Sequence, residues 1–250
     1  MDFPHRRPFR EKLNTSLRKR WYGPLRRAGA RRVVRSRYFG AEFIVDLEDL
    51  VGREIALNRF EWRELKIMLD ACRRLTPQVF IDVGANLGLY SCVLARSGAV
   101  PRVVAFEPDR ANFERLSANV RLNGLAGRVD LHEAAVGARA GEAMLVPSEA
   151  SNRGMSRIGE GDAAGGYRVP VVALDDVLRH DKGPVVLKVD VEGYEIEVLT
   201  GAARMLAGSG GFAQIEGRSD RAAGVIRELM ETFGWRFVER YGLDLRFEKP

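Results

Sequence analysis

The chain has 250 residues, of which 46% are hydrophobic and 30% charged, and its formal net charge is +6. This length accommodates one large α/β domain with a sizeable core, and the composition excludes collagen, coiled-coil and disulfide-scaffold proteins. No apolar run approaches the ~20 residues that a membrane span requires. Because Cys72 and Cys92 have no second Cys or His at metal-ligand spacing, the sequence predicts neither a disulfide nor a zinc site.

The positive charge is concentrated at the N-terminus. Residues 1–37 contain 13 Lys and Arg and 2 acidic residues, whereas the remaining 213 residues contain 27 Lys and Arg and 32 Asp and Glu. A protein that reads nucleic acid with its folded body carries basic charge on that body, so this distribution argues against a nucleic-acid platform. The N-terminus also lacks the apolar core of a signal peptide, which predicts a cytoplasmic location.

Residues 1–60 are predicted to form a basic arm and extension, and residues 61–250 the main domain. Apolar residues recur in the arm about every four positions between Arg and Lys: Phe3, Phe9, Leu13, Leu17, Trp21 and Leu25. A helix over residues 8–25 would display them as one stripe. That stripe either docks on the main domain or contacts the anionic inner face of a membrane, so a peripheral membrane location stays open.

From residue 61 onward, helical and strand patterns alternate. Apolar runs without polar alternation, typical of strands buried on both faces, occur at residues 78–83, 102–108, 128–136, 185–191 and 212–217. Helical periodicity occurs at residues 61–75, 90–97, 109–123, 194–206 and 221–233. Two further strands, at residues 235–241 and 244–249, are joined by Gly242.

These repeated strand–helix units predict an α/β fold with a doubly wound, mostly parallel sheet and an antiparallel hairpin at one edge. Such sheets bind ligands at the carboxyl ends of their strands. Residues 142–173 interrupt the alternation with extended segments around a loop rich in Gly, Ser and Asn. An insertion of this kind is suited to a substrate lid.

The ends of the first two strands predict an adenosine-type ligand. The first strand ends in the turn DVGANLG (82–88), and the second ends in Glu107, nineteen residues after Gly88. A glycine turn lets the backbone approach a ligand at a helix N-terminus, and an acid at the tip of the adjacent strand accepts the hydroxyl protons of a ribose.

The identity of the turn residues favours S-adenosylmethionine over a dinucleotide. The middle glycine of the dinucleotide fingerprint is replaced by Asn86, which disfavours pyrophosphate binding. S-adenosylmethionine carries an ammonium and a sulfonium group, and an acid inside the turn, Asp82, suits these positive charges. The sequence therefore predicts S-adenosylmethionine as the cofactor.

Five segments together resemble the FkbM family of S-adenosylmethionine-dependent methyltransferases. They are VFIDVGANLGLYS, VVAFEPDRANFERLSANVRLNGL, VPVVALDDVL, VVLKVDVEGYEIEVLTGA and QIEG, within a likeness that covers most of residues 42–217. The combination of DVGAN, FEP and KVDVEG is the specific part. The resemblance implies the Rossmann-like class I methyltransferase fold with seven strands, and O-methylation of a hydroxyl on a sugar, glycan or other natural product.

The resemblance also assigns the residues that contact the cofactor. Four residues of the turn are expected to line the methionine and the ribose: Asp82, Gly84, Asn86 and Gly88. Glu107 is expected to hold the ribose hydroxyls. The acid that often contacts the adenine amine after the third strand is here Ala135, so adenine recognition is expected from backbone and apolar contacts around Ala135 and Val136.

Candidate catalytic residues lie at the ends of the fourth and fifth strands. Strand alternation places Lys188 and Asp190 on one face of the fourth strand, and Gln214 and Glu216 on one face of the fifth. If the two strands are neighbours, these pairs meet beside the sulfonium. Polar residues in buried strands are costly unless paired, so one interpretation is a structural salt bridge of Lys188. In the other, Asp190 or Glu216 accepts the proton of the acceptor hydroxyl while Lys188 orients it.

Two further residues have alternative interpretations. Glu192 either joins the carboxylates or caps the following helix. With Asp190 and Glu216 it would suit Mg²⁺, but no spacing demands a metal and the sequence predicts none. His132 lies in the third strand and is expected to be a packed histidine rather than a base.

Two other functions stay open. An RNA or DNA methyltransferase would grip nucleic acid with the basic arm, but the fourth strand ends in KVDVEG rather than in the Asn/Asp-Pro-Pro-aromatic turn of enzymes that methylate exocyclic amines. A non-catalytic cofactor-binding protein is the second alternative. The expected partner is a small-molecule or glycan acceptor, whose identity the sequence leaves open together with the oligomeric state.

Overall fold

The computed structural model describes residues 33–148, 155–159, 165–178 and 183–250. The apolar stripe predicted for the arm lies outside the described residues. The described chain begins with the strands β1 (Val33–Tyr38) and β2 (Ala41–Asp46) and the helices α2 (Leu50–Ala56) and α3 (Trp62–Leu75).

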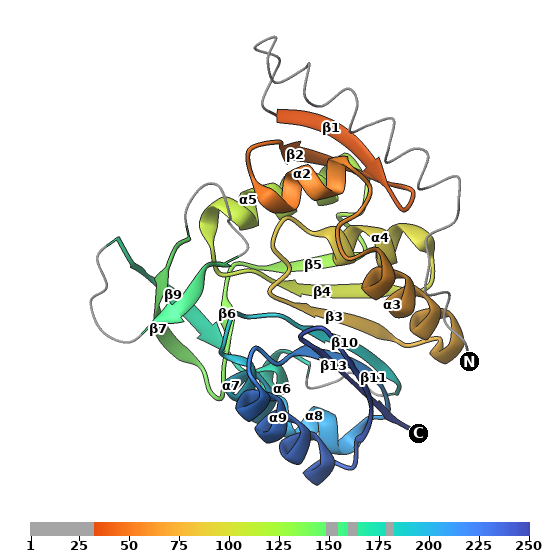
Figure 1. Cartoon of the computed structure of the whole chain (residues 1–250), viewed down its shortest axis with the longest axis vertical. Helices are drawn as coiled ribbons and strands as arrows, with labels where there is room; N and C mark the ends of the chain where they lie inside the picture. The colour runs from red at the N-terminus through yellow and green to blue at the C-terminus, as the bar shows by residue number, and fades with distance from the viewer. Residues whose placement is uncertain (1–32, 149–154, 160–164, 179–182) are drawn as a thin grey trace.

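The main sheet has seven strands: β3 (Val79–Val83), β4 (Arg102–Phe106), β5 (Val129–His132), β10 (Val185–Val189), β11 (Gly211–Glu216), β12 (Arg236–Tyr241) and β13 (Asp244–Lys249). Their order is β5-β4-β3-β10-β11-β13-β12, and β13 runs antiparallel to both of its neighbours. The pairs from β5 to β11 are parallel. The predicted doubly wound, mostly parallel seven-stranded sheet with an antiparallel edge hairpin is therefore confirmed (Figure 1).

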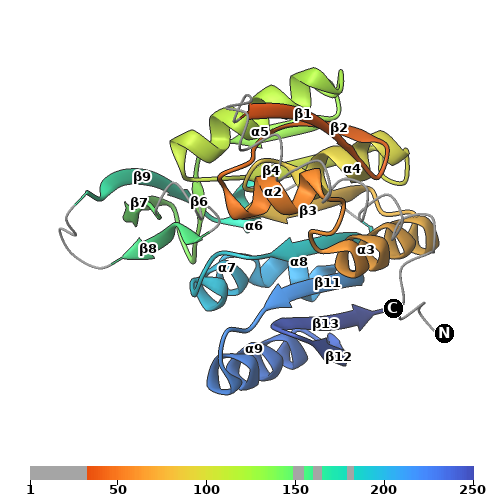
Figure 2. The same ribbon diagram turned by 45° about the horizontal axis from the view of Figure 1, so that its top comes forward.

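Helices cover both faces of the sheet (Figure 2). On one face, α3, α4 (Leu89–Ser97) and α5 (Arg110–Leu122) pack on strand residues such as Phe80 and Val186. On the other face, α6 (Leu174–Val177), α7 (Glu195–Thr200), α8 (Ala203–Gly208) and α9 (Asp220–Thr232) pack on the alternate residues, such as Ile81 and Leu187. Because apolar side chains point to both faces, the central strands are fully buried, as their uninterrupted apolar runs predict.

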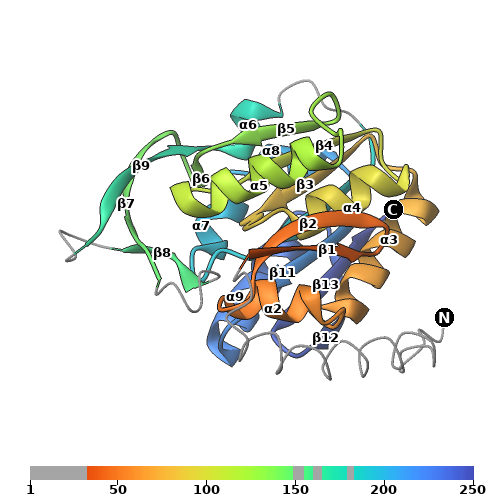
Figure 3. The ribbon, with the colours of Figure 1, turned by 90° about the horizontal axis from the view of Figure 1, so that it is seen from above.

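The β1–β2 hairpin lies beside α5 (Figure 3). Its backbone is hydrogen-bonded to that helix, since the Ile44 N–H donates to Asn119 Oδ1 (2.8 Å) and the Glu42 N–H donates to Asn123 Oδ1 (2.9 Å). Phe43 and Ile55 are fully buried in the same cluster as α3 and α4. Residues 33–60 thus share one hydrophobic core with the helices that follow.

The strand predicted over residues 128–136 is wrong in its extent. β5 ends at His132, and β6 (Ala135–Val136) pairs with β9 (Tyr167–Val172) in a second sheet of order β6-β9-β7-β8. This sheet is built from the insertion, which also supplies β7 (Gly141–Val146) and β8 (Arg157–Gly159), and it projects on the side of the carboxyl ends of the parallel strands (Figures 1 and 2). The chain changes sheets after His132 because β9 provides the next pairing partner.

The helix predicted over residues 194–206 is divided in two. α7 ends at Thr200 and α8 begins at Ala203, with Gly201 between them. A Cβ atom at Gly201 would lie 2.0 Å from the backbone oxygen of Gly137, so the chain crosses another backbone segment at this point. Among the described residues, no helix combines the length and apolarity needed to cross a membrane.

Candidate active site

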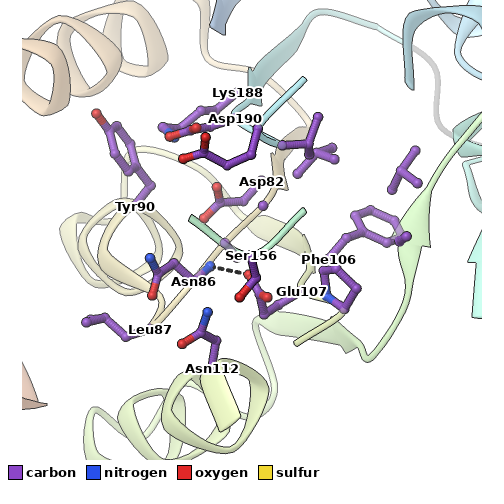
Figure 4. A pocket seen from close by; sticks show the side chains of 18 of the residues that line it. Asp82, Asn86, Leu87, Tyr90, Phe106, Glu107, Asn112, Ser156, Lys188 and Asp190 are labelled. Carbon is purple, nitrogen blue, oxygen red and sulfur yellow. Dashed lines mark hydrogen bonds and ion pairs between the residues drawn. The ribbon is translucent and has the colours of Figure 1, made fainter. Parts of the chain in front are cut away.

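A pocket that is partly open to solvent lies at the carboxyl ends of β3, β4 and β10. Here the chain reverses its direction through the sheet, because β4 and β5 extend to one side of β3 whereas β10 and β11 extend to the other. Ligands of doubly wound sheets bind at such a switch point. Figure 4 shows Tyr90, Lys188 and Asp190 at one end of the pocket and Glu107, Phe106 and Ser156 at the other.

Asp82, near the end of β3, brings a buried and unsatisfied oxygen to the pocket. Its side chain is 1% exposed, and Oδ2 accepts hydrogen bonds from the Ser91 N–H (3.0 Å) and the Ser91 hydroxyl (2.6 Å). Oδ1 is also buried and has no hydrogen-bond partner among the described residues. Burial raises the pKa of Asp82, while the nearby Lys188 ammonium opposes that rise. A cationic donor in the pocket would satisfy Oδ1.

The turn after β3 requires glycine at two positions for different reasons. Gly84 has φ +83°, and a Cβ atom there would lie 1.9 Å from the backbone oxygen of Asp190, so the turns after β3 and β10 touch. Gly88 has φ +88° and packs its α-carbon near Leu116 of α5. Of the turn residues predicted to contact the cofactor, Gly84 and Asn86 line the pocket, whereas Gly88 lies outside the lining and serves the packing of α4 on α5.

Glu107, at the tip of β4, accepts hydrogen bonds that hold the glycine turn in place. Its Oε2 accepts the Asn86 N–H (2.7 Å) and its Oε1 accepts the Asp109 N–H (2.9 Å) (Figure 4). Burial raises the pKa of Glu107 to about 7 against the lowering effect of these hydrogen bonds. The Asn112 side chain makes a third hydrogen bond to this carboxylate. Because each carboxylate oxygen can accept two hydrogen bonds, Glu107 retains capacity for a hydroxyl of a ligand.

The far wall of the pocket is apolar. Ala135 and Val136, the residues predicted to contact the adenine, line it because β6 leaves the main sheet there. The insertion adds Leu145, Ser156 and Ile158, which the sequence argument missed because their placement depends on pairing within the second sheet. The Ser156 hydroxyl donates to Asp109 Oδ2 (3.0 Å), which joins the insertion to the first turn of α5.

At the opposite end, Lys188 and Asp190 form an ion pair with Nζ and Oδ2 2.7 Å apart, and both residues line the pocket. β10 and β11 are neighbours, as the catalytic hypothesis required, and Lys188 lies in register with Asp82 on one side and Gln214 on the other. Burial alone would lower the pKa of Lys188, but the carboxylates of Asp190, Glu61 and Asp82 together raise it. Lys188 is therefore a permanent cation that is 5% exposed.

Glu216 completes a cluster of three carboxylates without lining the pocket itself. One oxygen each of Asp190, Glu192 and Glu216 lies within 4.8 Å of the others. Burial raises the pKa of Glu216 to about 8, and the charges of Asp190 and Glu195 add to that rise. Two members of the cluster already have a cation of the chain, since Lys188 pairs with Asp190 and Arg218 with Glu192.

Glu192 was interpreted either as a helix cap or as a member of the carboxylate cluster, and the structure supports the cluster. α7 begins only at Glu195, and the N–H of Gly193 donates to Glu195 Oε1 (2.9 Å) rather than to Glu192. His132 stacks on Phe106 with ring centroids 4.7 Å apart and an interplanar angle of 18°. It is a packed histidine, as expected, and lies outside the pocket lining.

Glu61 and Tyr90 line the pocket next to Lys188 and were missed by the sequence argument. The Tyr90 hydroxyl donates to Glu61 Oε2 (2.7 Å), and Lys188 Nζ lies 4.8 Å from the centroid of the Tyr90 ring. Tyr90 lies two residues after the glycine turn, and this position was a usable signal in the sequence. Glu61 had no such signal, because only the packing of α3 beside α4 brings it to the pocket.

Comparison with known proteins places these features in a family. The FkbM methyltransferase domain matches residues 82–216. Hexuronic acid methyltransferase AglP of Haloferax volcanii is 28% identical over 170 residues, which is 67% of this chain and 66% of AglP. Methyltransferase sdnD of Sordaria araneosa is 32% identical over 152 residues, 48% of this chain and 59% of that protein. The chain thus spans slightly less than two thirds of these curated relatives.

Among solved structures, a methyltransferase FkbM from Methylobacillus flagellatus superposes with a TM-score of 0.53 at 21% identity, covering 68% of this chain and 43% of that one. The likeness shows that the sheet and its helices have the class I methyltransferase fold. The family match spans more than half of the chain and begins and ends at two residues of the site, Asp82 and Glu216. The chain therefore belongs to the FkbM methyltransferase family.

Proposed function

We propose that this protein transfers the methyl group of S-adenosylmethionine to a hydroxyl of a sugar, glycan or other natural product. The observation that carries the proposal is the unsatisfied Oδ1 of Asp82 in the pocket. A buried carboxylate oxygen without a partner is costly, and the ammonium of the methionine moiety is a ligand group that would satisfy its charge and its hydrogen-bonding capacity.

The remaining pocket residues fit the other parts of the cofactor. Glu107 would accept a ribose hydroxyl, and the turn at Gly84, which lines the pocket, would contact the methionine chain. The apolar wall at Ala135 and Val136 would take the adenine. A dinucleotide fits less well, since the charge of Asp82 would repel a pyrophosphate.

Bound S-adenosylmethionine supplies an activated methyl group and a neutral thioether leaving group. The chain's own contribution is alignment, for which ~7 to 11 kcal/mol is available, and a base that contributes ~10²- to 10⁴-fold. Lys188 is placed to donate a hydrogen bond to the acceptor oxygen, and the ion pair with Asp190 holds it at the pocket surface. Asp190 and Glu216 are the carboxylates that the strand pattern offers for the acceptor proton.

The acceptor class rests on the charge of the whole domain and on one relative. Residues 38–250 contain 32 Asp and Glu against 27 Lys and Arg, and this acidic excess favours a small molecule or a glycan over nucleic acid. AglP is named as a methyltransferase of hexuronic acid, a sugar acid. Both observations support a sugar or a related hydroxyl compound as the acceptor.

Calorimetry tests the cofactor assignment through Glu107→Ala. The wild-type protein is expected to bind S-adenosylmethionine in the micromolar range without comparable binding of NAD. The variant should lose ~1.5 to 3 kcal/mol of that affinity, because a hydrogen bond to a charged group disappears. The wild-type affinity should also rise with pH through about 7, where Glu107 ionises, and the variant should lose this dependence.

Glu114→Ala is the matched control, since Glu114 is an exposed carboxylate on α5. It should leave both the affinity and its pH dependence unchanged. Tighter binding of NAD than of S-adenosylmethionine by the wild-type protein would contradict the cofactor assignment. An unchanged dissociation constant in Glu107→Ala would place the ribose contact elsewhere.

A further inference from the structure

Glu61 and Tyr90 form a hydrogen-bonded pair on the pocket wall beside the Lys188–Asp190 ion pair. Tyr90 is 4% exposed and directs its hydroxyl to Glu61 Oε2. The other oxygen, Oε1, has no hydrogen bond to any described residue, and it belongs to a side chain that lines the pocket. One carboxylate oxygen is thus anchored while the second is available to a ligand.

The backbone at Glu61 has an unusual conformation. Its φ and ψ angles are 41° and 40°, in the left-handed region that residues with a Cβ atom rarely occupy. Six described residues other than glycine have positive φ, and three of them line the pocket: Glu61, Asn86 and Glu192. Backbone strain collects at functional sites because the surrounding structure holds a side chain where chemistry needs it.

Titratable groups from three parts of the fold face Glu61. Lys188 lies in β10 and Asp190 directly follows that strand, Asp244 begins β13, and Tyr90 lies in the first turn of α4. Burial raises the pKa of Glu61 to about 7, the charges of Asp190 and Asp244 add to the rise, and Lys188 and the Tyr90 hydroxyl oppose it. A base that titrates near neutral pH is well matched to proton transfer under physiological conditions.

The other carboxylates that line the pocket each have another partner or position. Asp82 and Glu107 lie in the part of the pocket assigned to the cofactor, whereas Asp190 is paired with Lys188 and Glu192 with Arg218. Glu216 lies behind Asp190, outside the pocket lining. Glu61 therefore combines contact with the pocket and an available oxygen, and it precedes the part of the chain that the family match covers.

We propose that Glu61 receives the proton of the acceptor hydroxyl and that Tyr90 positions it, an inference that rests on the proposed methyl transfer. As the acceptor oxygen forms its bond to the methyl carbon, the carbon–sulfur bond breaks and its electron pair returns to sulfur. The hydroxyl proton passes to Glu61 Oε1 and is later released to solvent. Lys188 donates a hydrogen bond to the same acceptor oxygen from the neighbouring strand.

The test is a rate measurement with tritiated methyl groups. Wild-type protein and Glu61→Gln receive a saturating concentration of methyl-tritiated S-adenosylmethionine and, as acceptor, a glycan and metabolite extract of source cells that lack the protein. The variant keeps an oxygen that accepts from Tyr90 but loses basicity. It should transfer label about 100-fold more slowly or worse while its cofactor affinity and thermal unfolding stay unchanged.

A second variant makes the test independent of that single substitution. Tyr90→Phe removes a hydrogen bond that lowers the pKa of Glu61, so the acidic limb of the pH–rate profile should move to higher pH. A purely structural role for the pair would leave this limb in place. Glu64→Gln is the control, because Glu64 lies in the first turn of α3 and outside the pocket lining. This variant should behave as the wild type.

Two negative results have different meanings. If the wild-type protein transfers label and Glu61→Gln does so at the full rate with an unchanged acidic limb, the role of Glu61 is contradicted while the proposed function stands. If the wild-type protein itself transfers no label to the extract, the proposed function fails, and the assignment of Glu61 fails with it.

Discussion

Lys188→Met is expected to lower the free energy of unfolding by about 3–5 kcal/mol near pH 8. Methionine retains the length of the side chain, so the substitution removes the charge with little change in packing. Asp190, Glu61 and Asp82 all face the Lys188 ammonium in a buried environment, and they would lose their common cation. Removing one partner of a buried ion pair is far more costly than removing a surface charge.

The pH dependence of this loss follows from the same carboxylates. Burial already raises the pKa values of Asp82 and Glu61 above their ordinary values, and removal of Lys188 raises them further. A carboxylate whose pKa is higher in the folded state than in the unfolded state makes folding more favourable at low pH. This contribution to stability is lost as the pH rises through the folded-state pKa. The stability deficit of Lys188→Met should therefore shrink when urea denaturation is repeated near pH 5.

Lys66→Met is the control, because Lys66 pairs with Asp70 on the surface of α3, with each side chain about one third exposed. Surface pairs contribute ~0–1 kcal/mol, so this variant should be nearly as stable as the wild type at both pH values. Equal deficits for the two lysine variants would show that Lys188 is not the cation that compensates the pocket carboxylates.

Asp82→Asn is expected to weaken the binding of S-adenosylmethionine by about 3 kcal/mol or more, a factor above 100. The asparagine oxygen can still accept from Ser91, so the local structure should persist. What disappears is the charge opposite the methionine ammonium. Adenosine carries no ammonium group, and its affinity for the variant should be nearly that for the wild type.

Comparison of Asp82→Asn with Glu107→Ala separates the two ends of the cofactor. The Glu107 variant should lose affinity for adenosine and S-adenosylmethionine alike, because both ligands carry the ribose. Titration calorimetry of the wild type and both variants with the two ligands gives the six dissociation constants that this comparison needs. An equal loss of both ligands in Asp82→Asn would mean that the residue maintains the turn rather than binding the ammonium.

Much of this architecture could be predicted because it depends on residues that are close together in the sequence. The uninterrupted apolar runs of β3 and β10 show that both faces are buried, and strand alternation places Lys188 and Asp190 together. The glycine turn and Glu107 can be recognised in the sequence because each lies at the end of a predicted strand, where ligands of such sheets bind. Alternation predicts the face on which a side chain lies but not its depth, which is why Glu216 could not be placed behind the pocket wall.

Contacts between distant segments account for what could not be predicted. The split of the third strand depends on the pairing of Ala135 with Val171, and the break at Gly201 depends on the backbone at Gly137. Glu61 reaches the pocket because α3 packs beside α4, which brings it to Tyr90. No local pattern in the sequence encodes these tertiary contacts.

Isotope-edited NMR of the product shows which atom receives the methyl group, and we expect that atom to be oxygen. Purified protein is incubated with S-adenosylmethionine labelled with carbon-13 in the methyl group and with extract from source cells that lack the protein. We expect a new labelled methyl resonance in the methoxy range. The methyl group should be attached to a sugar or related hydroxyl compound that mass spectrometry shows to be one methylene heavier. Labelled methyl groups on nitrogen or carbon, or on nucleic acid, would contradict this expectation.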